Sequence, residues 1–278
     1  MLIDDLKKTV TDNKNIGNAL LLRNLLKEAL QFYTLNYIYN SKYGVDFLFK
    51  GGTCLRFCFD LPRLSEDLDF DIKNIQSFKP EVFMQDVANY FIGTRQFKEF
   101  KIKMAGNKRE IFLQFPVMRE LGLSGIGESN ILFLRIDLSG VDSKYYTQEV
   151  SIKSVFDLSF VITRYSLADL FASKITAIIK RTFQKGKGDI VTFKGRDYYD
   201  LIWFLERGIT PNWERALDIL KLKEIKEVIK LLDNKVESIK TEYLREDLLP
   251  LFKEVTFVDN FSKNFKELYR ENIKKLQR

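Results

Sequence analysis

Phe-Lys-Gly-Gly-Thr-Cys-Leu-Arg occupies residues 49–56 of this 278-residue chain, and Arg-Leu-Ser-Glu-Asp-Leu-Asp-Phe follows at residues 63–70. The first motif closes a short apolar run with Gly51 and Gly52, a pattern typical of a buried strand over residues 45–50 that ends in a tight turn. We expect Thr53 to cap a short helix that continues through residue 59. In the second motif apolar and acidic side chains alternate, which predicts a strand over residues 63–72 with Asp67, Asp69 and Asp71 on one face.

The glycine turn and the acidic strand together suggest a site for a nucleoside triphosphate and metal ions. Two glycines let the backbone turn sharply and leave amide groups free at a helix N-terminus, an arrangement that suits phosphate. Neighbouring carboxylates on one strand face repel each other unless a cation lies between them, and Mg²⁺ prefers such hard oxygen ligands. Each feature alone also fits an ordinary role, namely a plain strand-to-helix turn and an edge strand whose acids face water.

The rest of the first 165 residues mixes helices and strands without a regular βαβ period. Apolar periodicity predicts helices over residues 17–39 and 83–91 and strands over residues 97–103, 111–115 and 131–138. Beyond this point only helices are expected, at residues 166–183, 198–205, 213–220, 222–239 and 261–276. We therefore expect an α/β (α+β) fold: a mixed β-sheet domain flanked by helices, residues 1–165, then a helical C-terminal domain, residues 166–278, with the site in the cleft between them.

The composition restricts the chemistry. The 45 Lys and Arg residues exceed the 38 Asp and Glu residues, and the net charge of +7 is compatible with a polyanionic partner. The absence of histidine excludes His-based triads and His-ligated zinc, so any metal must bind to oxygen ligands. Cys54 and Cys58, four residues apart on one helix face, are expected to be buried thiols in a reducing cytoplasm. No apolar run reaches the roughly 20 residues of a membrane span.

The two motifs closely resemble the first motif of the AbiEii-type nucleotidyltransferase toxins of abortive infection systems. That family belongs to the DNA polymerase β-like nucleotidyltransferase superfamily. The resemblance implies that Asp67 and Asp69 are catalytic and hold metal, and that five further residues bind the nucleotide: Gly51, Gly52, Thr53, Arg56 and Ser65. Asp71 lies outside the family pattern and is interpreted as a solvated acid or as a support for the metal ligands.

Arg135-Ile136-Asp137 resembles the second family motif, with Arg where Lys is usual. By this resemblance Asp137 is a third catalytic carboxylate, which either binds metal or accepts the proton of the acceptor hydroxyl. An acid that only pairs with Arg135 at the end of a strand is the equally open alternative.

Lys174 lies in the middle of the apolar stripe of the helix that begins at Ser166, where an unpaired ammonium is costly. It must therefore meet an anion or extend to water, and Lys174 to Ala177 matches the family's Lys-x-x-Ala element. The residues Arg196 to Asp200 resemble the family's Arg-Asp-x-x-Asp element. Asp197 shares an inward helix face with Leu201, which makes Lys174 its expected partner. The resemblance implies that both residues are catalytic: Lys174 binds the nucleotide and neutralises phosphate charge, and Asp197 holds Lys174 in place. A salt bridge between two helices with no catalytic role is the competing interpretation.

Two further features of this region are assigned by the same reasoning. The resemblance assigns Asp200 to nucleotide binding. The segment 184–195, which contains Lys185, Lys187 and Lys194, is interpreted either as a basic loop that closes over phosphates or RNA or as a plain solvated loop.

The resemblance as a whole implies a metal-dependent nucleotidyltransferase toxin with a role in phage defence. It would use Mg²⁺ or Mn²⁺ and an NTP, modify RNA such as the 3′ end of tRNA, and be neutralised by a cognate antitoxin protein. Two alternatives remain open at this point. In the first, the same site belongs to a kinase or nucleotidyltransferase that modifies protein. In the second, the chain is a non-catalytic module that binds RNA or a partner.

Overall fold

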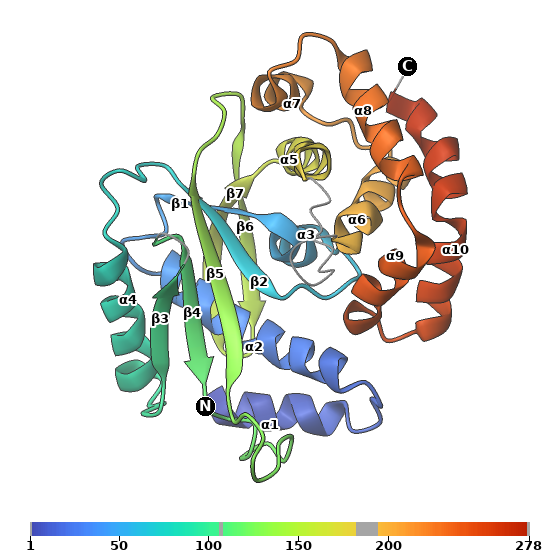
Figure 1. The fold of residues 1–278 in the computed structure, drawn as a ribbon. Coiled ribbons are helices and arrows are strands. Elements are labelled where there is room, and N and C mark those ends of the chain that lie inside the picture. The colour runs from blue at the N-terminus through green and yellow to red at the C-terminus, as the bar shows by residue number, and fades with distance from the viewer. Residues whose placement is uncertain (1, 106–107, 182–193, 277–278) are drawn as a thin grey trace. The chain divides into compact units, whose positions relative to one another are not determined.

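The computed structural model describes residues 2–105, 108–181 and 194–276. The chain divides into two compact units (Figure 1). The sheet unit comprises Met1–Cys58, Leu64–Val141 and Gln148–Arg164. The helical unit comprises Phe59–Arg63, Asp142–Thr147 and Tyr165–Arg278. Two short segments that precede residue 165 in the sequence thus belong to the helical unit.

The described strands form one seven-stranded sheet in the order β3-β4-β5-β2-β1-β7-β6. The central strands β1 and β2 are antiparallel, whereas β2 pairs in parallel with β5 and β1 in parallel with β7. The predicted mixed sheet is therefore confirmed. Its strands are β1 (Phe47–Lys50), β2 (Asp67–Ile72), β3 (Lys101–Ala105), β4 (Glu110–Phe115), β5 (Leu132–Gly140), β6 (Gln148–Val155) and β7 (Leu158–Tyr165).

Aromatic side chains fill the core of the sheet unit. The Phe70 ring lies 5.3 Å from the Phe47 ring and 5.2 Å from the Phe49 ring, between centroids, and all three rings are buried. Such contacts add to the stabilisation from burial alone and fix the central strands against each other. The helices of this unit are α1 (Leu2–Asp12), α2 (Ala19–Tyr39), α3 (Gly51–Phe59) and α4 (Pro80–Asn89), which continues into a π-helical turn, Tyr90–Thr94.

The helical unit confirms the predicted helical C-terminal region. Its helices are α5 (Leu167–Lys180), α6 (Gly195–Glu206), α7 (Trp213–Leu220), α8 (Ile225–Glu237), α9 (Thr241–Leu248) and α10 (Val255–Asn272). Ser166 caps α5, because its side chain accepts a hydrogen bond from the Asp169 amide. The Phe171 and Phe204 rings stack with centroids 4.4 Å apart and join α5 to α6. No described helix combines the length and apolar character needed to span a lipid bilayer.

Several predicted boundaries were wrong. The strand expected at residue 63 begins only at Asp67, since Arg63 belongs to the helical unit, and the strand expected at 97–103 is β3. Thr53 does not cap α3, because the helix already begins at Gly51 and the Thr53 hydroxyl donates to the Asp67 carbonyl oxygen. The strands β6 and β7 and the helices α1 and α9 were not predicted; β6 is largely exposed and lacks a clear apolar face.

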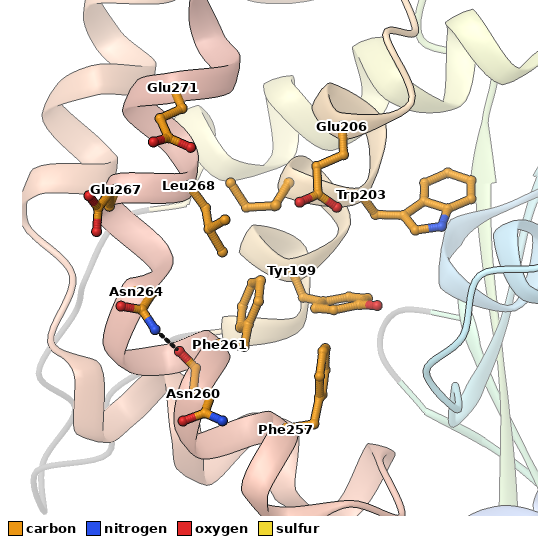
Figure 2. A pocket seen from close by; sticks show the side chains of 11 residues that line it. Tyr199, Trp203, Glu206, Phe257, Asn260, Phe261, Asn264, Glu267, Leu268 and Glu271 are labelled. Carbon is orange, nitrogen blue, oxygen red and sulfur yellow. Dashed lines mark hydrogen bonds between the residues drawn. The ribbon is translucent and has the colours of Figure 1, made fainter.

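A pocket of about 540 Å³ lies between α6 and α10 within the helical unit (Figure 2). Aromatic rings, among them Tyr199, Phe257 and Phe261, line it together with Glu206, Glu267 and Glu271. None of the site residues predicted from the sequence lines this pocket.

Candidate functional site

The register between β2 and β5 brings the acidic motif together with the Arg-x-Asp motif. The parallel pairing sets Asp67 opposite Arg135 and Asp69 opposite Asp137. Residues opposite each other on neighbouring strands project from the same face of the sheet, and so do residues two apart on one strand. Asp67, Asp69 and Asp137 therefore share one face. Glu110 of β4 lies opposite Asp137 and adds another acid to it.

The glycine turn lies directly against this acidic face. Gly51 has a φ angle of +78°, which favours glycine, and a Cβ atom placed on it would lie 2.0 Å from Asp69 Oδ2. The carboxylate of Asp69 thus packs on the backbone at the start of α3, where helix amides are not used within the helix. The neighbouring Gly52 and Thr53 lie in the first turn of α3, and Thr53 is tied to β2 through the Asp67 carbonyl oxygen. The structure therefore brings the predicted phosphate turn and the predicted metal ligand into contact.

A guanidinium group lies among the carboxylates. Arg135 Nη2 is 2.6 Å from Asp67 Oδ2 and 3.1 Å from Asp137 Oδ2. Asp137 Oδ1 is buried and has no hydrogen-bond partner within the part of the chain that the structure describes. Burial, and then the charge of Asp69, raises the pKa of Asp137 to about 6, although Arg135 acts in the opposite direction. Asp137 is therefore crowded by negative charge that Arg135 only partly neutralises.

Three carboxylates at one place provide the hard oxygen donors that Mg²⁺ and Mn²⁺ prefer, and the unpartnered Asp137 Oδ1 is suited to a cation. Among the described residues, however, no group of three or more Asp, Glu or Cys side chains has the arrangement of a metal site. The Arg135 guanidinium contacts two of the three carboxylates, Asp67 and Asp137. The donor set fits the metal, and the assignment of Asp67, Asp69 and Asp137 as ligands stays a prediction.

In the helical unit, Lys174 is held between two acids of α6. Its Nζ lies 2.9 Å from Asp197 Oδ1 and 2.7 Å from Asp200 Oδ2. Asp200 is fully buried and also accepts two hydrogen bonds from Arg63, at 2.6 and 2.7 Å. Arg181 is a further partner of Asp197. The expected contact between Lys174 and Asp197 is thus present, inside a network that also ties the segment Phe59–Arg63 to α6.

The sequence matches the family described as "Nucleotidyl transferase AbiEii toxin, Type IV TA system" over residues 34–273. The chain belongs to the AbiEii family of nucleotidyltransferase toxins. The family resemblance of the two motifs is therefore confirmed, and the chain is a nucleotidyltransferase of a toxin–antitoxin system.

The solved structure of MenT4 supports the fold of this toxin. The nucleotidyltransferase toxin MenT4 from Mycobacterium tuberculosis H37Rv superposes with a TM-score of 0.61 at 16% identity, covering 96% of this chain and 92% of MenT4. JHP933 from Helicobacter pylori gives a TM-score of 0.48 at 15% identity, covering 91% of this chain and 93% of its own. No curated protein matches the toxin sequence significantly. At such identities the MenT4 likeness concerns the fold alone.

The remaining predicted nucleotide contacts of the toxin have protein partners. Arg56 pairs with Glu28 of α2, with Nη2 3.0 Å from Oε1. Ser65 is buried, and its carbonyl oxygen accepts a hydrogen bond of 3.0 Å from Gln31. The predicted roles of Arg56, Ser65 and Asp200 in nucleotide binding stay predictions. Lys185 and Lys187 of the predicted basic loop lie outside the described residues, and Lys194 directly precedes α6.

One of the two interpretations of Asp71, that it is a solvated acid, is wrong. Asp71 is fully buried, and its Oδ1 lies 2.6 Å from Lys50 Nζ and 2.8 Å from Ser139 Oγ. Lys50 belongs to the first motif, but no role was predicted for it from the sequence. The same is true of Arg63, whose partner Asp200 is 137 residues away in the sequence. Lys50 stands opposite Asp69 in the antiparallel pairing of β1 with β2, two strands that α3 separates in the sequence.

Burial and charge act in opposite directions in the Lys174 network, with charge prevailing at Asp200 and burial at Lys174. Burial raises the pKa of Asp200, but the charges of Arg63 and then Lys174 outweigh it and hold that pKa below the ordinary value. Burial lowers the pKa of Lys174, against the opposing charge of Asp200. Lys174 carries three N–H donors, of which two point to Asp197 and Asp200, and no third partner occurs within the described residues.

Proposed function

We propose that this toxin transfers a nucleotide from an NTP to an RNA acceptor, the 3′ end of tRNA, in a reaction that depends on Mg²⁺ or Mn²⁺. The contact of the Asp69 carboxylate with the Gly51 backbone, on the same sheet face as Asp137, carries the proposal. This contact combines a backbone turn suited to phosphate with carboxylates suited to a divalent cation, which are the two requirements of a metal–triphosphate complex.

The sheet unit supplies the metal ligands and the phosphate turn. Asp67, Asp69 and Asp137 would hold the metal, and the bound metal would neutralise charge on the phosphates. The amides at Gly51 and Gly52 would bind phosphate oxygens at the start of α3, where the helix dipole favours an anion. Because Gly51 has no side chain, the Asp69 carboxylate lies close to the α3 backbone, so a metal ion on Asp69 and the α3 amides would act on the same triphosphate.

In the reaction, the acceptor hydroxyl oxygen forms a bond to the α-phosphorus of the NTP. The bond from that phosphorus to the bridging oxygen breaks, and pyrophosphate leaves in line with the attack. Asp137 is the carboxylate assigned either to the metal or to the hydroxyl proton, and its Oδ1, which has no hydrogen-bond partner in the described part of the chain, would serve either role. In this mechanism the protein contributes alignment, charge neutralisation and the removal of one proton.

The helical unit contributes Lys174. Its third N–H donor is assigned to the phosphates, while Asp197 and Asp200 use the other two and hold the ammonium in one place. Asp200 in turn is fixed by the two hydrogen bonds from Arg63, so Asp200 acts as a positioning residue. Asp197, which holds Lys174 together with Asp200, is the acid that we assign to the active site.

The net charge of +7 supports a polyanionic acceptor, and membership of a toxin–antitoxin family supports a cognate antitoxin protein as partner.

The purified toxin is incubated with each of the four α-labelled NTPs, Mg²⁺ and total RNA, and RNA and protein are then counted separately. We expect label on RNA with at least one NTP, and its loss in Asp69→Asn but not in Asp157→Asn, the same change at an exposed turn residue. Absence of label from RNA with all four NTPs would contradict the proposal. Label on protein instead, from α- or γ-labelled NTP, would favour a protein-modifying enzyme.

A further inference from the structure

Arg135 lies at the place that the metal of the proposed function requires. A single nitrogen, Nη2, reaches two of the three predicted ligands, Asp67 at 2.6 Å and Asp137 at 3.1 Å. The guanidinium therefore reduces the repulsion between the two carboxylates, as a divalent cation bound to both would also do. We propose that Arg135 is a resident cation of the metal-free toxin, which leaves these acids for the nucleotide phosphates when metal and NTP bind together. The inference rests on the proposed function and concerns how its site is loaded.

The manner in which Arg135 is bound differs from that of a structural arginine in the same chain. Arg63 donates through Nε and Nη2 to both oxygens of Asp200, at 2.6 and 2.7 Å, and both side chains are at most 1% exposed. Such a two-point contact fixes the guanidinium plane. Arg135, by contrast, is 28% exposed, and its buried Nε has no hydrogen-bond partner among the described residues. Arg135 thus leaves part of its donor capacity unused.

Charge explains why the resident cation must move. Asp67, Asp69 and Asp137 carry three negative charges, and Arg135 neutralises one of them at hydrogen-bond distance. A divalent ion placed among the same carboxylates would meet the guanidinium at close range, where like charges repel strongly. Triphosphate oxygens offer the guanidinium a two-point acceptor that matches its planar donors. The nucleotide therefore supplies a new partner for Arg135, and the movement of Arg135 to the phosphates leaves the carboxylates to the metal.

Binding of Mn²⁺ without nucleotide tests this role, with the bound ion followed by electron paramagnetic resonance. Arg135→Gln removes the competing charge, so we expect it to bind Mn²⁺ at least about tenfold more tightly than the parent. Arg119→Gln removes the same charge at an exposed position and should bind Mn²⁺ as the parent does. The affinity for a fluorescent ATP analogue with Mg²⁺ should fall in Arg135→Gln, because the phosphates lose a partner.

Two outcomes would overturn the inference. One is an Arg135→Gln variant whose Mn²⁺ affinity stays within twofold of the parent. The other concerns the variant Arg135→Lys, which keeps the positive charge but loses the planar donors of the guanidinium, and which replaces the Gln variant if that variant does not fold. We expect Arg135→Lys to bind Mn²⁺ about as tightly as the parent and to bind the ATP analogue more weakly. Binding of the analogue as tight as that of the parent would count against the inference.

Failure of the proposed function gives a different result. If Asp67→Asn and Asp69→Asn bind Mn²⁺ and the ATP analogue as the parent does, these acids are not metal ligands, whatever Arg135 does. Thermal unfolding of each variant shows whether it is folded.

Discussion

Replacing Gly51 by alanine adds a single methyl group at the contact on which the proposed function depends. The new Cβ would lie 2.0 Å from Asp69 Oδ2 and 2.7 Å from Asp69 Cγ, whereas ordinary contacts begin at 3.4 Å. The carboxylate must therefore retreat by the difference, 3.4 minus 2.0, or about 1.4 Å. A misplacement of about 1 Å in a catalytic arrangement can cost on the order of 100-fold in rate. We expect Gly51→Ala to lose about 100-fold or more in nucleotide transfer.

The same substitution also strains the backbone, and this effect must be separated from the first. Alanine at a φ of +78° costs about 1–2 kcal/mol of stability. Such a loss lowers the melting temperature of a chain of this size by several degrees at most. Gly122 offers a matched control, because its φ is +70° and a Cβ there meets nothing within 4 Å. Gly17 has neither the positive φ nor a close neighbour and serves as the second control.

The assay is label transfer from the preferred α-labelled NTP to RNA, at a temperature where thermal unfolding shows all variants to be folded. Gly122→Ala should lose a similar amount of stability to Gly51→Ala and keep the activity of the parent. Gly17→Ala should match the parent in both. If Gly51→Ala and Gly122→Ala were equally active, the position of the Asp69 carboxylate would be irrelevant to the reaction and the reasoning would be refuted.

Three further predictions use the same preparations. Asp200→Asn leaves Arg63 and Lys174 without a buried counter-charge, so it should lower the free energy of unfolding at pH 7 by about 3–5 kcal/mol. The pKa of Asp200 is held below its ordinary value, so its stabilisation is present above about pH 4 and is lost as the pH falls through the lower folded pKa. Denaturant unfolding between pH 7 and pH 2 should therefore show the difference between parent and variant shrinking in acid, and a constant difference would contradict this account. Asp71→Asn should destabilise the sheet unit, since Lys50 loses a buried partner, but leave Mn²⁺ affinity close to that of the parent, unlike Asp69→Asn. Removal of divalent metal with EDTA should abolish label transfer, and added Mg²⁺ or Mn²⁺ should restore it; transfer that persists in EDTA would exclude the metal-dependent mechanism.

Local patterns in the sequence predicted the features that depend on neighbouring residues. The glycine pair after an apolar run located the start of α3 within two residues, and the helical C-terminal region followed from its periodicity. The contact of Lys174 with Asp197 joins two helices, but it was predicted because each helix by itself turns a charge inward and a buried charge needs a partner. In each case the signal is contained within one or two turns of a single helix or strand.

Features that depend on long-range pairing were not predicted. Arg63 meets Asp200 across 137 residues, and nothing near Arg63 distinguishes it from a surface arginine before a strand. Asp71 follows the same alternation as Asp67 and Asp69, but pairing with β1 and β5 encloses it with Lys50 and Ser139. Burial of an acid therefore depends on which strands become its neighbours, and a single strand pattern does not contain that information.

The two charged motifs of the sheet unit share the same spacing, and this explains how they form one site. Asp67 and Asp69 are two residues apart, as are Arg135 and Asp137, so the parallel register of β2 and β5 brings both pairs onto one face. A slip of one residue would turn one motif to the opposite face and separate the carboxylates. The buried neighbours Leu68, Phe70 and Ile136 oppose such a slip, because it would expose their apolar side chains. The apolar half of each strand thus fixes the register on which the acidic half depends.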